Sequence, residues 1–266
     1  MARTRIIVNG DGIESIVRFD KHQIAQHWLL IISEMMLLLT GLPQKFATWA
    51  ASQWWINVLG GMENVRIVHR IGAYLMIALC VYHVIYLLYS ILVLKRPFPK
   101  KMLPTRQDIV GFFQEMMYLV GWRKEEPKWD RFNWKEKFEY WSIAWGGPIM
   151  ILSGFILMFP VFFTNMLPGW IVPTALVAHS WEAIIALIWI FVVHFFFVHF
   201  GPGVFPLNKS IFTGKVPVKL YKHEHPLEYE RLIAQQKEEE GNDSGHTEDT
   251  LYREGEEEED SLYSKK

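Results

Sequence analysis

Four long apolar runs dominate the pattern of hydrophobic and polar positions along the chain. A transmembrane helix needs roughly 20 predominantly apolar residues, and each run reaches that length. The runs cover residues 24–43, 67–94, 138–163 and 174–200. The pattern therefore predicts an all-α integral membrane protein, with a four-transmembrane-helix bundle over residues 24–208.

The segments outside the bundle are polar. Residues 1–23 form an N-terminal segment, and residues 209–236 extend the chain beyond the last span. The final stretch, 237–266, is rich in glutamate and almost free of apolar side chains. Such a composition cannot bury a core, so an acidic, disordered C-terminal tail is expected.

One connecting segment has helical amphipathicity. Thr105 is a plausible N-cap for a helix over residues 106–120. Its apolar positions fall on one stripe: Ile109, Phe112, Phe113, Met116, Met117 and Val120. We expect this helix to lie in the membrane interface; packing on a soluble partner is the alternative.

The distribution of basic residues predicts the orientation. The 95–137 connection holds eleven Lys and Arg residues, whereas residues 44–65 hold only Lys45 and residues 161–178 are uncharged. Positively charged loops stay in the cytoplasm, so both termini are expected there. The whole chain has 27 basic and 28 acidic residues. This near balance gives no information about nucleic acid; the four apolar runs indicate the lipid bilayer as the surrounding partner, and no nucleic-acid partner is expected.

Six histidines lie inside or at the ends of the apolar runs. An ionisable ring is costly in hydrocarbon and therefore marks a candidate functional site. The six are His27, His69, His83, His179, His194 and His199. Cys80 is the only cysteine, so cysteine-ligated metal clusters and CxxCH haem attachment within the chain are excluded.

Two histidine pairs have nearly equal spacing. His69 and His83 are 14 residues apart, and His179 and His194 are 15 apart. At 1.5 Å per residue, each pair spans about 21–22 Å along its helix. Two parallel helices of this kind can clamp two haems b, one above the other, without a covalent bond.

The outer level contains only His69 and His179, whereas the inner level is ambiguous. His83, His194 and His27 all fall at the inner depth, and His199 lies one to two turns nearer the cytoplasm. Two haems need four of these ligands. A third haem, using His27 or His83 with His199, remains open at this point.

Several short motifs resemble the cytochrome b (gamma) subunit of respiratory formate dehydrogenases and the wider group of cytochrome b/b6-type subunits. Resemblance covers residues 16–232. The motifs are His27-Trp28, Leu39-Thr40-Gly41-Leu42-Pro43, Arg66-Ile67-Val68-His69-Arg70-Ile71-Gly72, Glu136-Lys137-Phe138-Glu139-Tyr140-Trp141 with Gly146, His194 through Phe205-Pro206, Thr213-Gly214-Lys215-Val216 and His225-Pro226-Leu227-Glu228-Tyr229.

The resemblance implies a haem pairing of His27 with His194 and of His69 with His179. His83 departs from that pattern and is similar to the 14-residue pair of bc-type cytochromes b, which would pair it with His194. The resemblance also implies a menaquinone site at the inner haem, near His27 or His199, Gln107, Asp108 and the 106–120 helix.

The expected function is electron transfer between the quinone pool and a periplasmic partner, in a hetero-oligomeric complex of the bacterial inner membrane. The partner would be a multihaem cytochrome c or an iron–sulfur or catalytic subunit, and substrate chemistry would belong to that subunit. A proton-relay transporter and a membrane di-iron oxygenase are the alternatives. Glu34 and Glu182 lie on the histidine-bearing faces. Each could carry protons, could interact with a haem propionate or a partner histidine, or could be a protonated, hydrogen-bonded structural group.

Overall fold

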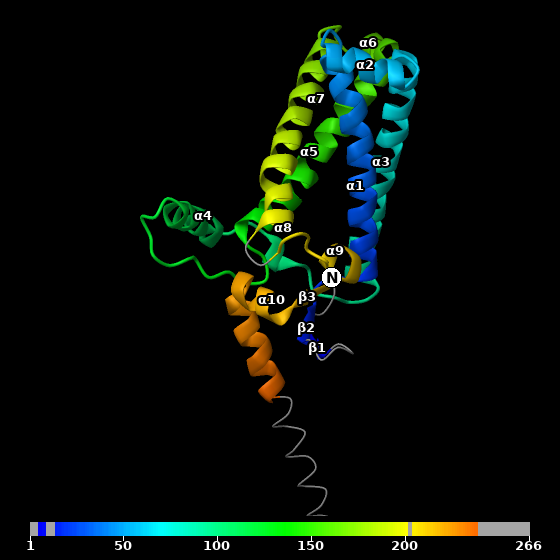
Figure 1. Ribbon diagram of the computed structural model, residues 1–266. Coiled ribbons are helices and arrows are strands. Elements are labelled where there is room, and N and C mark those ends of the chain that lie inside the picture. The colour runs from blue at the N-terminus through cyan, green and yellow to red at the C-terminus, as the bar shows by residue number, and fades with distance from the viewer. Residues whose placement is uncertain (1–4, 9–13, 202–203, 239–266) are drawn as a thin grey trace, which may run out of the picture.

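Four long helices form the body of the protein (Figure 1). The computed structural model describes residues 5–8, 14–201 and 204–238. Each long helix has the length and apolar composition needed to cross a membrane, which confirms the predicted all-α membrane bundle. The helices are α1 (Lys21–Lys45), α3 (Met62–Leu92), α5 (Trp134–Met158) and α7 (Ile171–Ile188), the last continuing through η2 (Trp189–His194) and α8 (Phe195–Phe200).

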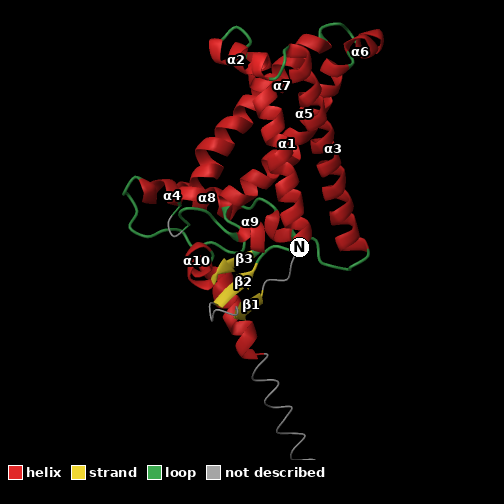
Figure 2. Cartoon of the chain, turned by 45° about the vertical axis from the view of Figure 1, so that its right-hand side comes forward, coloured by secondary structure: helices red, strands yellow, loops and turns green. Residues whose placement is uncertain are grey.

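Short helices and a small sheet, which the sequence did not predict, lie at the two ends of the bundle. Figure 2 shows short helices at one end, called the far end, and a small sheet at the other, called the sheet end. The far end carries α2 (Ala50–Val58) and α6 (Pro160–Met166). The sheet is antiparallel in the order β1 (Arg5–Val8), β2 (Glu14–Val17), β3 (Lys215–Pro217).

The four spans pack as two helix pairs. Helix α1 packs along α3, and α5 packs along α7, whereas α3 and α5 touch much less. Gly72 permits the close approach of α3 to α1, because a Cβ there would lie 3.2 Å from Met36 Cβ and from Leu37 Cγ. Between the two pairs the bundle is open enough to hold a large ligand.

Helix α4 (Arg106–Leu119) extends sideways at the sheet end, as Figures 1 and 2 show. Thr105 caps it in a capping box with Asp108, which confirms the predicted start. One face is anchored, because Gly111 lies directly against Trp129 and Glu115 accepts a hydrogen bond from Trp134 Nε1 at 2.6 Å. The opposite face exposes apolar side chains, as expected of a helix in a membrane interface.

Charged and aromatic side chains hold residues 204–238, called the sheet-end cap, against the sheet end of the bundle. Arg18, only 4% exposed, forms an ion pair with Glu136 at 2.8 Å, and Arg131 pairs with Glu228 at 3.2 Å. His225 Nδ1–H donates to Asp130 O at 2.6 Å. Burial, followed by the positive charge of Arg18, lowers the pKa of His225 to about 3, so its ring is neutral near pH 7.

The elements that build this sheet-end cap come from residues 204–238. They are α9 (Ser210–Thr213), β3, α10 (Val218–Glu224) and a helix over residues 226–238. Arg18 N and Phe19 N both donate to Gly214 O, at 2.8 and 3.1 Å, and so join the start of α1 to the end of α9. Most of the predicted acidic tail, 239–266, lies outside the described residues.

Candidate functional site

A cavity of about 2640 Å³ runs through the bundle between the two helix pairs. Ordinary ligand pockets measure about 300–1,000 Å³, so this cavity has room for more than one large ligand. Histidines from α1, α3 and α7 line it at two levels. They are His69 and His179 toward the far end, and His27, His83 and His194 toward the sheet end.

The far level brings His69 and His179 together, with ring centroids 6.2 Å apart. His69 Nδ1–H donates to Thr40 Oγ1 at 2.9 Å, while the Thr40 hydroxyl donates to Met36 O at 2.6 Å. The hydroxyl proton is therefore engaged elsewhere, and the ring supplies the proton of the shared bond. This leaves the Nε2 lone pair of His69 free to bind a metal.

His179 is held in the same way from the other helix pair. Its Nδ1–H donates to Ser153 Oγ at 3.0 Å, and the Ser153 hydroxyl donates to Ile149 O at 2.6 Å. A glycine follows each hydroxyl residue and makes room for the ring. A Cβ at Gly41 would lie 3.2 Å from His69 Cε1, and one at Gly154 would lie 3.3 Å from His179 Cε1.

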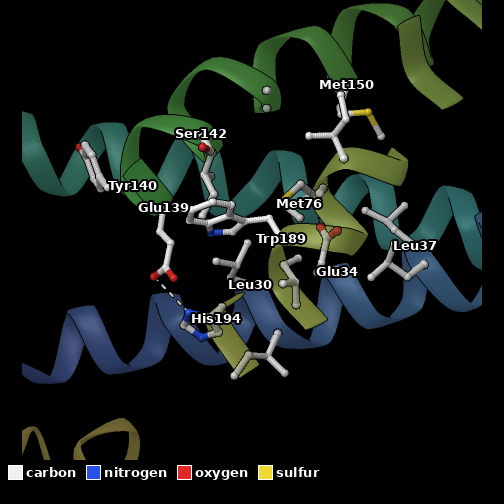
Figure 3. Close-up of a pocket in the computed structure, with 18 of the residues that line it drawn as sticks. Leu30, Glu34, Leu37, Met76, Glu139, Tyr140, Ser142, Met150, Trp189 and His194 are labelled. Atoms are coloured by element: carbon white, nitrogen blue, oxygen red, sulfur yellow. Dashed lines mark ion pairs between the residues drawn. The ribbon is translucent and has the colours of Figure 1, made fainter. Parts of the chain in front are cut away.

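The sheet-end level brings His27 and His194 together, with ring centroids 6.3 Å apart. His194 Nδ1–H donates to Glu139 Oε2 at 3.0 Å, the contact drawn as a dashed line in Figure 3. A carboxylate behind a ligating histidine fixes the tautomer and strengthens the ring as a donor to metal. The sequence did not single out Glu139 for this role.

A π turn sets the direction of His194. Fifteen residues after His179, an uninterrupted α-helix would place His194 about 60° beyond four full turns. The η2 segment, Trp189–His194, is π-helical. Because a π turn takes up one extra residue, His194 still faces the cavity as His179 does.

Both ring separations agree with two imidazoles that share one iron. An imidazole nitrogen binds a metal at about 2 Å, and its ring centre lies about 1.1 Å behind that nitrogen, so two rings that would hold one metal ion between them have centroids roughly 6.2 Å apart. The observed values are 6.2 and 6.3 Å. The residues present thus fit bis-histidine haem.

Comparison with known proteins identifies the family. Residues 18–214 match the prokaryotic cytochrome b561 family. The chain belongs to this family. It is also 26% identical over 221 residues to the cytochrome b556(Fdn) subunit of the nitrate-inducible formate dehydrogenase of Escherichia coli K12, O157:H7 and Shigella flexneri, covering 82% of this chain and 93% of each relative.

The protein is therefore an integral inner-membrane cytochrome b of respiratory electron transfer, and haem b is its implied cofactor. The predicted family resemblance is confirmed. Family membership favours electron transfer over the transporter and di-iron oxygenase alternatives.

Two of the six membrane histidines of this cytochrome, His83 and His199, do not face another histidine among the described residues. His83 Nδ1–H donates to Gln26 Oε1 at 2.8 Å, and His83 Nε2 lies 3.2 Å from the Tyr140 hydroxyl. His199 Nδ1–H donates to Pro206 O at 3.0 Å, and its ring packs on Phe195. His199 is five residues beyond His194, about 140° around the helix, and it is not among the described residues that line the cavity.

The two intramembrane acids both lie along the cavity. Glu34 lines it on α1, between the two histidine levels, and Figure 3 shows it beside Met76 and Leu37. Glu182 lies on α7 with Oε1 directly over Gly146, where a Cβ would collide with it. Of the Lys and Arg side chains that line the cavity, three lie near the far ends of α1 and α3: Lys45, Arg66 and Arg70.

Sequence reasoning missed the groups that hold the rings, although a signal for two of them exists. Thr40-Gly41 and Ser153-Gly154 are both hydroxyl–glycine pairs within apolar runs. A buried hydroxyl residue beside a glycine is suited to receive a bulky polar ring. This pattern could have located the contacts of His69 and His179.

Proposed function

We propose that this cytochrome carries electrons between the quinone pool and a redox partner on the periplasmic side, through two bis-histidine haems b. His69 and His179 would hold the haem at the far level, and His27 and His194 the haem at the sheet-end level. The observation that carries the proposal is the pair of ring separations, 6.2 and 6.3 Å, each suited to one iron.

Bound haem supplies reversible one-electron chemistry, at a potential set by its ligands, hydrogen bonding and burial. The chain's own residues orient the ligands. Thr40 and Ser153 are neutral partners of the far-level rings, whereas Glu139 places a carboxylate behind His194. Lys45, Arg66 and Arg70 offer positive charge at the far level for haem propionates.

The orientation rests on the basic residues. Of the eleven Lys and Arg residues of 95–137, nine lie in the connection from α3 to α5, and Lys135 and Lys137 lie in the first turn of α5, at the sheet end. The positive-inside rule then puts the sheet end and both termini in the cytoplasm and the far end in the periplasm. A periplasmic multihaem cytochrome c or iron–sulfur or catalytic subunit would dock at the far end. The relatives are subunits of a formate dehydrogenase, which supports such a complex.

Menaquinone or another quinone would exchange at the sheet end. The cavity reaches α4 through Glu115, Tyr118 and Leu119, so the interfacial helix does border it. The sequence suggested four polar residues for the quinone site, and of these His27 lines the cavity. Asp108 is paired with Lys137 at 2.8 Å, and Gln107 is exposed.

Replacing His83 and His199 together by leucine tests the number of haems. Since His83 is held by Gln26 and Tyr140 and His199 by Pro206 O, we expect the double variant to keep both haems. Pyridine haemochrome per chain should read two in the wild type and in the variant. A wild type with three haems, or loss of one in the variant, would show that one of these rings is a ligand.

Replacing Glu139 by glutamine tests the assignment of His194. Removing a negative charge next to a histidine that would bind the iron should stabilise the reduced state, so the midpoint potential of one haem should rise by roughly 59 mV, the equivalent of a tenfold change for one electron. Ser153→Ala is the matched change at the far level and removes only a neutral hydroxyl, so its shift should be smaller. A redox titration in which Glu139→Gln moves neither haem contradicts the assignment.

A further inference from the structure

The two helix pairs contain the same local pattern. His27-Trp28 is followed by Thr40-Gly41, and Tyr140-Trp141 is followed by Ser153-Gly154, in both cases 13 residues further along the helix. The tryptophans also behave alike. Trp28 Nε1–H donates to Ile211 O at 3.1 Å, and Trp141 Nε1–H donates to Met102 O at 2.8 Å.

The partner helices repeat as well. His69 is followed by His83 on α3, and His179 is followed by His194 on α7, the extra residue being taken up by the π turn. Exchanging α1 with α5 and α3 with α7 therefore exchanges His69 with His179. The same exchange carries the pair His27–His194 onto the pair Tyr140–His83.

Tyr140 and His83 thus occupy the second of two equivalent positions at the sheet-end level. Their rings have centroids 5.8 Å apart, and the Tyr140 hydroxyl lies 3.2 Å from His83 Nε2. This contact is direct, so the rings are not spread to accept an iron between them. The Tyr140–His83 pair therefore forms a polar site, which differs from the His27–His194 pair proposed to bind haem.

Gln26 supplies an unused hydrogen-bond donor to this site. It is 8% exposed, its Oε1 accepts from His83 Nδ1–H, and its amide nitrogen Nε2 has no hydrogen-bond partner among the described residues. Gln26, His83 and Tyr140 all line the cavity. A buried donor without an acceptor is destabilising, so an oxygen from a ligand is expected here.

The hydrogen bonds define what that ligand must offer. His83 donates from Nδ1, so Nε2 accepts from the Tyr140 hydroxyl, and the phenolic oxygen retains lone pairs. The site can therefore donate to a carbonyl through Gln26 and accept from a hydroxyl through Tyr140. A quinone carbonyl and a quinol hydroxyl are a matching pair of groups.

The surroundings favour a neutral oxygen over a carboxylate. All three side chains of the site are uncharged in this hydrogen-bond arrangement, and Figure 3 shows Glu139 next to Tyr140 on α5. Lys137, one turn before Tyr140, is paired with Asp108. Trp145 lines the cavity and is also 75% exposed, so the cavity reaches the lipid-facing surface of α5, where a lipid-soluble molecule can enter.

We propose that Gln26, His83 and Tyr140 form the head-group site for the quinone, on the α1–α3–α5 side of the sheet-end level. The proposal rests on the proposed function and gives the quinone a location apart from α4 and His199. The quinone carbonyl accepts a hydrogen bond from the Gln26 amide. The reduced head group donates to Tyr140, whose hydroxyl His83 keeps in place.

The test measures binding of menadione, a naphthoquinone head group without an isoprenoid tail, to the purified full-length cytochrome in lipid nanodiscs by equilibrium dialysis. Gln26→Leu removes the free donor, and Tyr140→Phe removes only the hydroxyl. Each should raise the Kd for menadione or its quinol about tenfold, the effect of losing one buried hydrogen bond. The haem content and the visible spectrum should not change.

Matched controls are Gln44→Leu and Tyr74→Phe. Gln44 lies at the opposite end of α1, where its Nε2–H donates to Thr40 O at 3.1 Å, and the Tyr74 hydroxyl contacts Met158 Sδ on the exposed side of α3. Both controls should bind menadione like the wild type.

Three outcomes would overturn the proposal, and they are distinguishable. Wild-type affinity in both Gln26→Leu and Tyr140→Phe, with full haem, rejects this site alone. Loss of haem with unchanged menadione affinity shows that the oxygen bound by Gln26 belongs to a haem carboxylate. A wild-type cytochrome that does not bind menadione rejects the quinone role in the proposed function as well.

Discussion

Replacing either His69 or His179 by alanine is expected to remove one and the same haem b, and replacing either His27 or His194 the other. The rings of each pair lie 6.2 or 6.3 Å apart and face the same cavity. A bis-histidine iron loses its coordination when one ring is missing. Pyridine haemochrome should fall from two haems to one per chain, and low-temperature spectra should lose the same band within each pair.

His22→Ala is the control for this series. His22 lies on α1 outside the cavity lining, where its Nδ1 contacts the Tyr82 hydroxyl at 2.7 Å, so both haems should remain. If His69→Ala and His179→Ala remove different bands, the proposed pairing is wrong. The same holds if His27→Ala leaves both bands in place.

Replacing Arg18 by alanine is expected to release the sheet-end cap. Arg18 is almost fully buried, donates to Glu136 Oε1 at 2.8 Å and to Arg131 O at 3.0 Å, and lies over the rings of Phe132 and Tyr221. Removing one partner of such an ion pair leaves the other charge uncompensated, at a cost of about 3 kcal/mol. Hydrogen exchange of residues 215–238 should become much faster.

Lys21→Ala is the comparison for that experiment, since Lys21 is exposed at the first turn of α1. It should leave exchange of the cap unchanged. The haem content should remain at two in both variants, because both histidine levels lie within the bundle. Unaltered exchange in Arg18→Ala would mean that the cap is held mainly by the sheet and by Tyr221, which is fully buried.

The sequence was sufficient for features that depend on position along a helix. Hydropathy located all four spans, and the 1.5 Å rise placed each histidine at a level. The third span was predicted to reach residue 163, whereas α5 ends at Met158, because Pro160 cannot continue the helix and instead begins α6. It could not decide between His27 and His83 at the inner level, because depth does not specify which neighbour a ring faces. That choice depends on packing, and the structure brings His27 to His194 and His83 to Gln26 and Tyr140.

Other features depend on contacts that are remote in sequence. β2 pairs with β3 through Ser15 and Pro217, about 200 residues apart, and strands of three or four residues leave too little periodicity to recognise. The π turn at Trp189–His194 could not be predicted from the sequence either. The spacings of 15 and 14 residues differ little in length along the helix, but in an unbroken α-helix a spacing of 15 would point His194 about 60° away from the direction of His179.

The division of the bundle into two helical hairpins has a consequence for how the protein is assembled. In the proposed pairing, each haem takes one ligand from the α1–α3 hairpin and one from the α5–α7 hairpin. Neither hairpin alone offers a complete site, and the two meet chiefly across the cavity. Haem that binds between the two hairpins would therefore link them. The free energy of unfolding of the whole bundle would then increase with the amount of haem available to the protein.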